Sequence, residues 1–481
     1  MYQGISRVGS YVFHLLLLTT ILFIVFIHLY LQMPGVDAGI HMYGAFLISK
    51  GLFPYTHLWN NKPPLIYLIG TVGFLIRSNP FLGVRIFELI IFFLNLFLLN
   101  KILSLASLKD RFIWLLSFSA IYLVCWDEGF LTETFTIPLA LSALYFFLIR
   151  IRYYEFICAL LLVSAFLLKQ NGFLTIAGIA AADIFWDYRQ RNTLRKVIRY
   201  LLALLICLLI LILVLEGSGI WHDFLDQVFV YNTEFAESPT LYRALIDHIR
   251  HNSFLSVKGI SAVIIFNICI LLTLRKLWIR RRNGRLNLLW DKMLLVSTLI
   301  YLLSYFFVYI TGKTYPHYFI LLIVPATLIM GHYVAETMLG KIALLILLIV
   351  GFSVNISRID SYKTISENRR TVADFLKQNS PPNEFIHLVG FGNQYIYVMA
   401  DRLSNTKFVM PLFENNGYTK SYQNILRIDF SNHPPLFIIL NKNNYKKLDP
   451  GNFYTQIVMQ TIARDHQVFE NELFVVYKRN D

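Results

Sequence analysis

The chain has 481 residues, of which 56% are hydrophobic, 16% aromatic and only 15% charged, whereas about a quarter of the residues in a soluble domain are charged. This composition excludes an ordinary soluble protein and indicates a polytopic membrane protein. The net charge of +14 is what basic loops that orient membrane spans would produce, so it is no evidence for nucleic-acid binding. The four cysteines all lie inside apolar runs and lack the spacing of a disulfide framework or a zinc site.

The first apolar run covers residues 11–31 and is followed by no small-residue cleavage site, so we expect a retained spanning helix. Run 64–76 is the weakest, because a helix of that length extends about 20 Å against a hydrocarbon core of about 30 Å. The other apolar runs are 83–104, 112–126, 134–149, 153–168, 172–186, 197–215, 257–274, 293–311, 316–335 and 341–355.

The charges of the loops decide how run 64–76 is counted. If it lies along the membrane surface, most basic residues, including those of 189–199 and 275–292, share one face with the amino terminus. Counting it as a span would move nearly all of them to the opposite face, which the positive-inside rule disfavours. We therefore expect an α-helical membrane protein with about 11 transmembrane helices, the amino terminus in the cytoplasm, and residues 1–355 as its membrane domain.

From about Asn355 the composition becomes mixed polar and apolar. This pattern predicts a C-terminal extracytoplasmic α/β domain over residues 356–481, with a helix at 361–378. The strand-like runs are Phe385–Phe391, Tyr395–Met399, Leu436–Leu440 and Leu473–Tyr477.

The outward loops hold an isolated carboxylate and several ammonium groups. Asp37 and Lys62 both lie in the first of these loops. Such charges are costly at the mouth of an apolar bundle, so they mark a functional site more often than they serve packing. The other outward segments are Trp126–Glu133, Lys169–Asn171, 216–256 and Thr311–Tyr318, and we expect all of them to meet over one cavity.

The order of short motifs along these loops resembles a known family. The motifs are Asp37, Gly51-Leu52-Phe53-Pro54-Tyr55, Trp59 with Lys62-Pro63-Pro64-Leu65, Lys169-Gln170-Asn171, and Gly312-Lys313-Thr314-Tyr315-Pro316-His317-Tyr318-Phe319 with Pro325. Together they resemble the GT-C integral-membrane glycosyltransferases, in particular the bacterial relatives of protein O-mannosyltransferases and the aminoarabinose transferase of lipid A (glycosyltransferase family 39). The resemblance implies transfer of a sugar from a polyprenyl-phosphate carrier to an acceptor on the outer face, with inversion. Many relatives carry a second acidic residue where this chain has Ala38.

The proposed reaction needs a base and a cationic site for the leaving phosphate. Asp37 is the candidate base for the acceptor hydroxyl; its alternative role is the N-cap of a helix that follows Gly35. Lys62, Lys169 and Lys313 are the candidate ligands of the donor phosphate, with His317 as a further donor of a hydrogen bond. The alternative for the lysines is that they are snorkelling anchors at the membrane surface.

Further side chains are expected to shape the pocket. The carboxylates among them would bind sugar hydroxyls or orient a lysine, or are solvated loop residues. His41 follows Asp37 by one helical turn, but the pair lacks a third metal ligand, so we expect no cofactor, and a divalent metal is not indicated. The residues expected in the sugar and acceptor pocket are His41, Tyr55, His57, Trp59, Asp127, Glu128, Glu133, Gln170, Tyr315 and Tyr318.

The expected partners are a polyprenyl-phosphate-linked sugar donor, a lipid, glycan or protein acceptor, and membrane lipids, with no nucleic acid. We expect a multi-pass protein of the cytoplasmic (inner) membrane with its active site on the extracytoplasmic face. A transporter or flippase of a lipid-linked sugar is the alternative, although such proteins are typically built from repeats around a midplane site. A non-catalytic scaffold would explain the polar tail but not the collected lysines.

Overall fold

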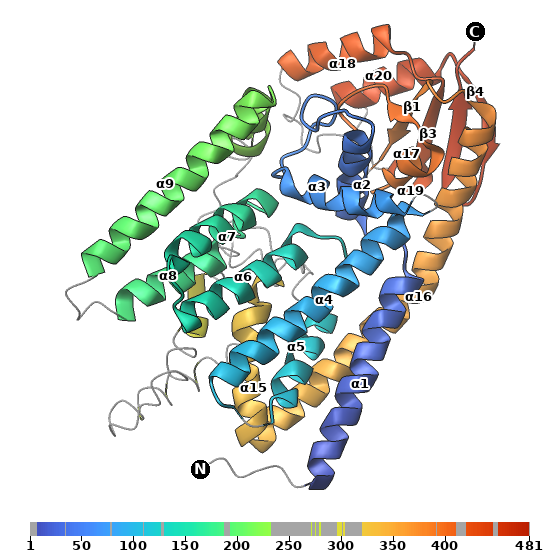
Figure 1. Cartoon of the computed structure of the whole chain (residues 1–481). Coiled ribbons are helices and arrows are strands. Elements are labelled where there is room, and N and C mark those ends of the chain that lie inside the picture. The colour runs from blue at the N-terminus through green and yellow to red at the C-terminus, as the bar shows by residue number, and fades with distance from the viewer. Residues whose placement is uncertain are drawn as a thin grey trace. The chain divides into compact units, whose positions relative to one another are not determined.

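A computed structural model describes most of the chain (Figure 1). The described residues are 7–33, 35–76, 79–108, 110–126, 129–186, 193–231, 296–300, 320–390, 392–409, 420–445 and 451–480, with isolated residues at 271, 275, 279, 302 and 303. The chain divides into two compact units. Unit 1 contains residues 1–30, 85–216 and 236–357, and unit 2 contains 31–84, 217–235 and 358–481.

Within the described part of the chain, five helices are long and apolar enough to cross a membrane. They are α1 (Arg7–Tyr30), α4 (Pro80–Leu105), α6 (Thr132–Ile149), α9 (Thr193–Gly217) and α16 (Met338–Asn379). Side chains such as Leu201, Leu205 and Leu213 of α9 are more than half exposed, as expected for a helix that faces lipid. The chain is therefore a multi-pass membrane protein.

Four further apolar runs form shorter helices, which are α5 (Phe112–Cys125), α7 (Tyr154–Leu168), α8 (Leu174–Trp186) and α15 (Ile323–Glu336). Nearly every residue of α5 is buried, so α5 is an interior helix that packs against both α1 and α15. The predicted helices of these runs are confirmed. Runs 257–274 and 293–311 lie largely outside the described residues.

The weak run 64–76 is a short, broken helix in unit 2. It forms α3 (Leu65–Thr71) and continues as one 3-10 turn, η1 (Val72–Leu75). The two parts together extend only about 18 Å, which agrees with a segment that does not span. They pack on α2 (Val36–Ser49), where a Cβ at Gly44 would lie 2.4 Å from the Tyr67 ring. Gly44 thus permits the close approach of the two helices.

One buried carboxylate ties four helices of unit 1 together. Asp183 of α8 accepts hydrogen bonds from the hydroxyls of Tyr154 (2.6 Å) and Tyr200 (3.2 Å). It also forms ion pairs with Lys196 at 2.9 Å and Arg150 at 3.4 Å. A buried charge is tolerated when it is paired and hydrogen-bonded in this way, so Asp183 serves packing among α6, α7, α8 and α9.

Helix α16 runs without a break for 42 residues (Figure 1). The predicted helix 361–378 is therefore the second half of the same helix that begins as an apolar segment. No glycine or proline occurs between Phe352 and Asn379, so nothing in the local sequence ends the helix where the composition changes.

The C-terminal region, residues 356–481 and called the tail below, contains a five-stranded sheet with the order β2-β1-β3-β5-β4. Its strands are β1 (Phe385–Val389), β2 (Leu403–Ser404), β3 (Phe437–Asn441), β4 (His466–Glu470) and β5 (Phe474–Lys478). β1 is parallel to β2 and β3, while β5 is antiparallel to β3 and β4. The prediction of a C-terminal α/β domain is confirmed, and three of the four predicted strands are present.

The remaining predicted strand, Tyr395–Met399, is wrong, because these residues form the helix α17 (Tyr395–Ala400). Its aromatic and β-branched composition favours a strand, but the chain is turned on both sides. Gly390 and Gly392 have φ values of 118° and 81°, and Asp401 has a φ of 55°. The two glycines turn the chain directly after β1, and Asp401 ends α17, so the segment between these turns forms a short buried helix.

Helices cover both faces of the sheet. On one face, Phe375 of α16 packs on Phe437 of β3 and Phe469 of β4. On the other, Ile438 and Leu440 join a buried cluster with α18 (Lys420–Asn432) and α20 (Phe453–Ile462). The short α19 (Lys442–Tyr445) follows β3 directly. This alternation of sides along β3 is the period of two expected of a strand buried on both faces.

Candidate functional site

Asp37 lies in the first turn of α2 with its side chain half-buried. The N-cap of α2 is Gly35, so the alternative role of Asp37 as the N-cap is wrong. A carboxylate in the first turn is still favoured by the helix dipole. Within the described residues, the carboxylate has no hydrogen-bond or ion-pair partner.

The tail of the chain anchors α2. The Tyr395 hydroxyl of α17 donates a 2.8 Å hydrogen bond to the carbonyl of Gly35. Further along α2, the Tyr43 hydroxyl accepts a hydrogen bond of 2.9 Å from the Ser404 N–H, and its ring packs on Tyr397. Burial raises the pKa of the Tyr43 phenol well above its usual range, so the hydroxyl stays protonated. The carboxylate of Asp37 is thus carried by a helix that is held at its start, by Gly35, and at its middle, by Tyr43.

The loop between α2 and α3 is held by its own aromatic residues. Tyr55 is fully buried, and its hydroxyl donates a 2.8 Å hydrogen bond to the carbonyl of Lys62. The backbone N–H of Trp59 donates to the carbonyl of Lys407 at 2.8 Å, and its ring lies in the buried cluster of the tail. These contacts are those of a packed core, and a role of either residue toward a sugar stays a prediction.

A glutamine that sequence reasoning missed also holds this loop. Gln227 lies in a π-helical segment, η2 (Asp226–Val230), that follows α10 (Trp221–Leu225). Its side chain accepts a hydrogen bond from the Asn60 N–H at 3.0 Å and donates one to the Tyr55 carbonyl at 2.9 Å. The residue is nearly fully buried. A single glutamine in a long loop gives no sequence signal for such a role.

The backbone of Lys62 is hydrogen-bonded within the loop, whereas its side chain forms no ion pair within the described residues. Its N–H donates to the Asn60 side chain at 3.1 Å and its carbonyl accepts from Tyr55. The ammonium group is half-buried and has no ion-pair partner within the described residues. Asp37 and Lys62 are therefore two half-buried charged residues of unit 2 that have no counter-charge within the described part of the chain.

The two histidines of this region differ. His41 is buried, with its ring edge-on to Tyr67 at 6.3 Å. His57 is exposed and its Nδ1 lies 2.8 Å from the Thr56 hydroxyl; it lines a cavity of about 490 Å³ together with Asp429 and His433. In the described part of the chain, no group of three or more metal-ligating side chains comes together.

In unit 1, Lys169 is already paired. Its ammonium group forms a buried ion pair with Glu133, whose other oxygen accepts a 2.7 Å hydrogen bond from the Thr132 hydroxyl. Glu133 lies in the first turn of α6 and Lys169 directly follows α7, and Gln170 lies in the turn after it. The geometry is that of a carboxylate that orients a lysine, which was one of the roles expected for Glu133.

A second buried ion pair of unit 1 was missed from the sequence. Arg85 and Glu88 of α4 are both fully buried and pair at 2.7 Å. Glu88 also accepts a hydrogen bond from the Phe130 N–H, and the Arg85 guanidinium lies over the Trp126 ring. The sequence signal was present, because opposite charges three residues apart inside an apolar run mark a buried pair.

This pair also contacts Gly129 and Phe130, which precede α6. A Cβ at Gly129 would lie 1.9 Å from Nη1 of Arg85, and Gly129 has a φ of 75°, so only glycine suits the position. Six candidate residues lie outside the described part of the chain, which are Asp127, Glu128, Lys313, Tyr315, His317 and Tyr318.

Comparison with solved structures identifies the fold. The chain is similar to ArnT from Cupriavidus metallidurans bound to undecaprenyl phosphate, with a TM-score of 0.64 and 11% identity over 96% of this chain and 97% of that one. It is also similar to the apo state of the same protein, with a TM-score of 0.62 and 12% identity over 98% of both chains. No family model and no curated protein sequence matches the chain. The chain thus has the fold of ArnT, a GT-C glycosyltransferase, over nearly its whole length.

Proposed function

We propose that the chain is a glycosyltransferase that moves a sugar from a polyprenyl-phosphate donor to an acceptor hydroxyl. The observation that carries the proposal is the pair of half-buried charges, Asp37 and Lys62, that have no counter-charge within the described residues of a chain with the fold of ArnT. The ArnT structure bound to undecaprenyl phosphate supports a polyprenyl phosphate as the leaving group.

The reaction is a single displacement with inversion. The oxygen of the acceptor hydroxyl forms a bond to the anomeric carbon, and the bond from that carbon to the donor phosphate oxygen breaks. The hydroxyl proton passes to the Asp37 carboxylate, which acts as general base. The phosphate gains negative charge as it leaves, and the Lys62 ammonium stabilises that charge more in the transition state than in the ground state.

The other candidates take supporting roles in this proposal. Lys169, oriented by Glu133, donates a further hydrogen bond to the phosphate, and Lys313 with His317 adds positive charge around it. The remaining candidate side chains line the sugar and acceptor pocket. Nucleotide sugars are absent outside the cytoplasm, so a lipid-linked donor places the reaction on the extracytoplasmic face, with the tail on the same side. We propose no cofactor.

The experiment that tests the proposal uses membranes that contain the full chain. They are incubated with a panel of polyprenyl phosphates whose sugars are radiolabelled, and both label transfer and free polyprenyl phosphate are measured. We expect one donor to lose its sugar in membranes with the chain and not in membranes with Asp37→Asn. If label instead crosses the membrane while still attached to its lipid, the chain is a transporter and the proposal is wrong.

A further inference from the structure

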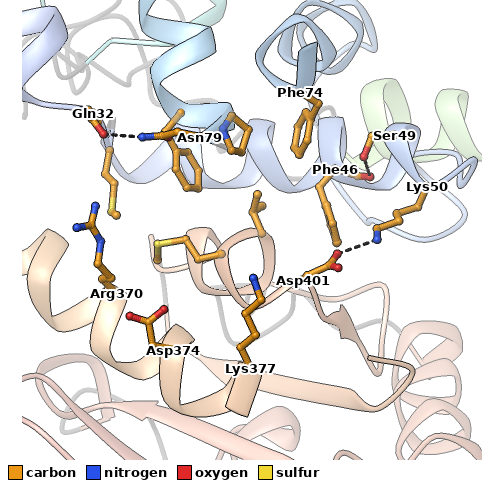
Figure 2. A pocket seen from close by; sticks show the side chains of 15 residues that line it. Gln32, Phe46, Ser49, Lys50, Phe74, Asn79, Arg370, Asp374, Lys377 and Asp401 are labelled. Carbon is orange, nitrogen blue, oxygen red and sulfur yellow. Dashed lines mark hydrogen bonds and ion pairs between the residues drawn. The ribbon is translucent and has the colours of Figure 1, made fainter. Parts of the chain in front are cut away.

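A second cavity of unit 2 lies apart from Asp37 and Lys62, neither of which lines it. Its volume is about 810 Å³. The lining comes from the segment after α1, from α2, from η1 and the start of α4, and from α16 and α17 (Figure 2). Segments far apart in the sequence thus enclose one space within a single unit.

One side of this cavity is apolar. It is formed by Met33, Phe46, Phe74, Phe81 and Met399. Three of these side chains are buried and two are half-buried, and the rings of Phe46 and Phe74 pack at 6.2 Å. Aromatic side chains offer a large apolar surface, and methionine adapts to flexible apolar ligands such as lipid chains.

The opposite side is a charged stripe of α16. Arg370, Asp374 and Lys377 are spaced so that they share one face of the helix. All three are exposed, and none has an ion-pair partner within the described residues. Figure 2 shows Arg370 and Lys377 extending from α16 toward the cavity.

The remaining charges of the lining are already matched. Lys50 pairs with Asp401 at 2.7 Å, and the side-chain N–H of Asn79 donates a 2.8 Å hydrogen bond to the side-chain oxygen of Gln32. The cavity is therefore left with two cations and one carboxylate that have no partner there, which is an excess of positive charge. This charge favours an anionic ligand.

The lining residues flank two candidate spans. Gln32 and Met33 lie two and three residues after the end of α1, and Pro80 is the first residue of α4. Spanning helices end at the level of the lipid head groups. Next to Phe74, Leu75 exposes 79% of its surface, which suits contact with lipid chains and would be costly in water.

We propose that this cavity binds the head group of an anionic membrane lipid. The phosphate of the lipid accepts hydrogen bonds from Arg370 and Lys377, and the first part of its chains lies on Phe74 and Leu75. This inference does not depend on the proposed transfer reaction, because it uses a different cavity and different residues. It gives the tail a direct contact with the membrane surface.

The test uses the purified full chain in a neutral detergent. Phosphatidylglycerol or phosphatidylcholine is added, and native mass spectrometry counts the lipid retained per protein. The variant Arg370→Gln/Lys377→Gln removes both cations, and Lys420→Gln/Arg464→Gln removes two exposed cations of the same unit that do not line the cavity. Glycerol phosphate is added as a competitor that has a head group but no chains.

We expect the unaltered chain to retain phosphatidylglycerol in preference to phosphatidylcholine. A cation near an anionic lipid surface contributes about a fivefold change in affinity, so the cavity variant should lose about 25-fold and the control variant little. Equal losses in the two variants would overturn the proposal, as would equal retention of both lipids. Displacement by equimolar glycerol phosphate would also overturn it, because the site would then bind a free phosphate and not a lipid.

Discussion

Replacing Lys62 with methionine separates a phosphate ligand from a membrane anchor. Methionine keeps an apolar stem of similar length but removes the charge. In the structure the ammonium group has no ion-pair partner within the described residues, so no buried carboxylate loses its counter-charge. The loop is held through backbone groups of Lys62 by Tyr55 and Asn60, and those bonds do not require the side chain. The fold should therefore tolerate the change.

The expected loss lies in catalysis. A hydrogen bond to a charged group contributes about 1.5 to 3 kcal/mol, which corresponds to about a ten- to hundredfold decrease in kcat/KM. The free energy of unfolding should change by no more than about 0.5 kcal/mol, as for a surface substitution. A snorkelling anchor would instead keep both its transfer rate and its stability, because the apolar stem that it needs is preserved.

The assay measures sugar transfer from the donor that the radiolabelled panel selects, together with affinity for polyprenyl phosphate. Lys420→Met is the matched control, since Lys420 is an exposed lysine of the same unit at the start of α18. If Lys62→Met keeps the transfer rate and the lipid-phosphate affinity of the control, Lys62 does not bind the leaving group.

Three further predictions follow from buried groups. Lys169→Met should destabilise unit 1 by about 3–5 kcal/mol because it leaves Glu133 buried and unpaired, and adding Glu133→Gln should recover most of that loss. An unchanged unfolding temperature of the single variant would contradict the ion pair. Burial lowers the pKa of His387 to about 4, so its contribution to the stability of the tail should be complete above pH 6.5. About 3 kcal/mol of the free energy of unfolding should be lost as the pH falls toward 4, which proteolysis at increasing urea concentration would measure. A pH response that persists in His387→Gln would assign it to another group. Gly129→Ala should cost at least about 1–2 kcal/mol from its left-handed backbone alone, and more because Arg85 occupies the space of the added methyl group; normal stability would refute this packing.

Local sequence patterns predicted the apolar helices, the helix 361–378 and three of the five strands of the sheet. Apolar runs of sufficient length became helices because a spanning segment must satisfy its backbone internally. The strand β4 was missed because it is mostly exposed and lacks the alternation of a half-buried strand. Tyr395–Met399 was misassigned because the turns on either side of it, and not its own composition, decide its structure.

The candidate site was only partly predictable. Asp37 and Lys62 could be found because isolated charges in an apolar chain are conspicuous. The support of α2 by Tyr395 and Tyr43 could not, because those hydrogen bonds join residues about 360 positions apart and buried tyrosines in both segments resemble ordinary core residues. The role of Gln227 could not be predicted for the same reason, because its partners Asn60 and Tyr55 are also distant in the sequence.

The measurement that tests the central claim most directly separates donor binding from chemistry in Asp37→Asn. Asparagine has nearly the same shape, and Gly35, not Asp37, caps α2, so the variant should bind the polyprenyl-phosphate sugar with the affinity of the unaltered chain. In single-turnover assays its release of polyprenyl phosphate should be slower by about 10² to 10⁴, the usual contribution of a general base. Release at a near-normal rate with the donor fully bound would contradict the account.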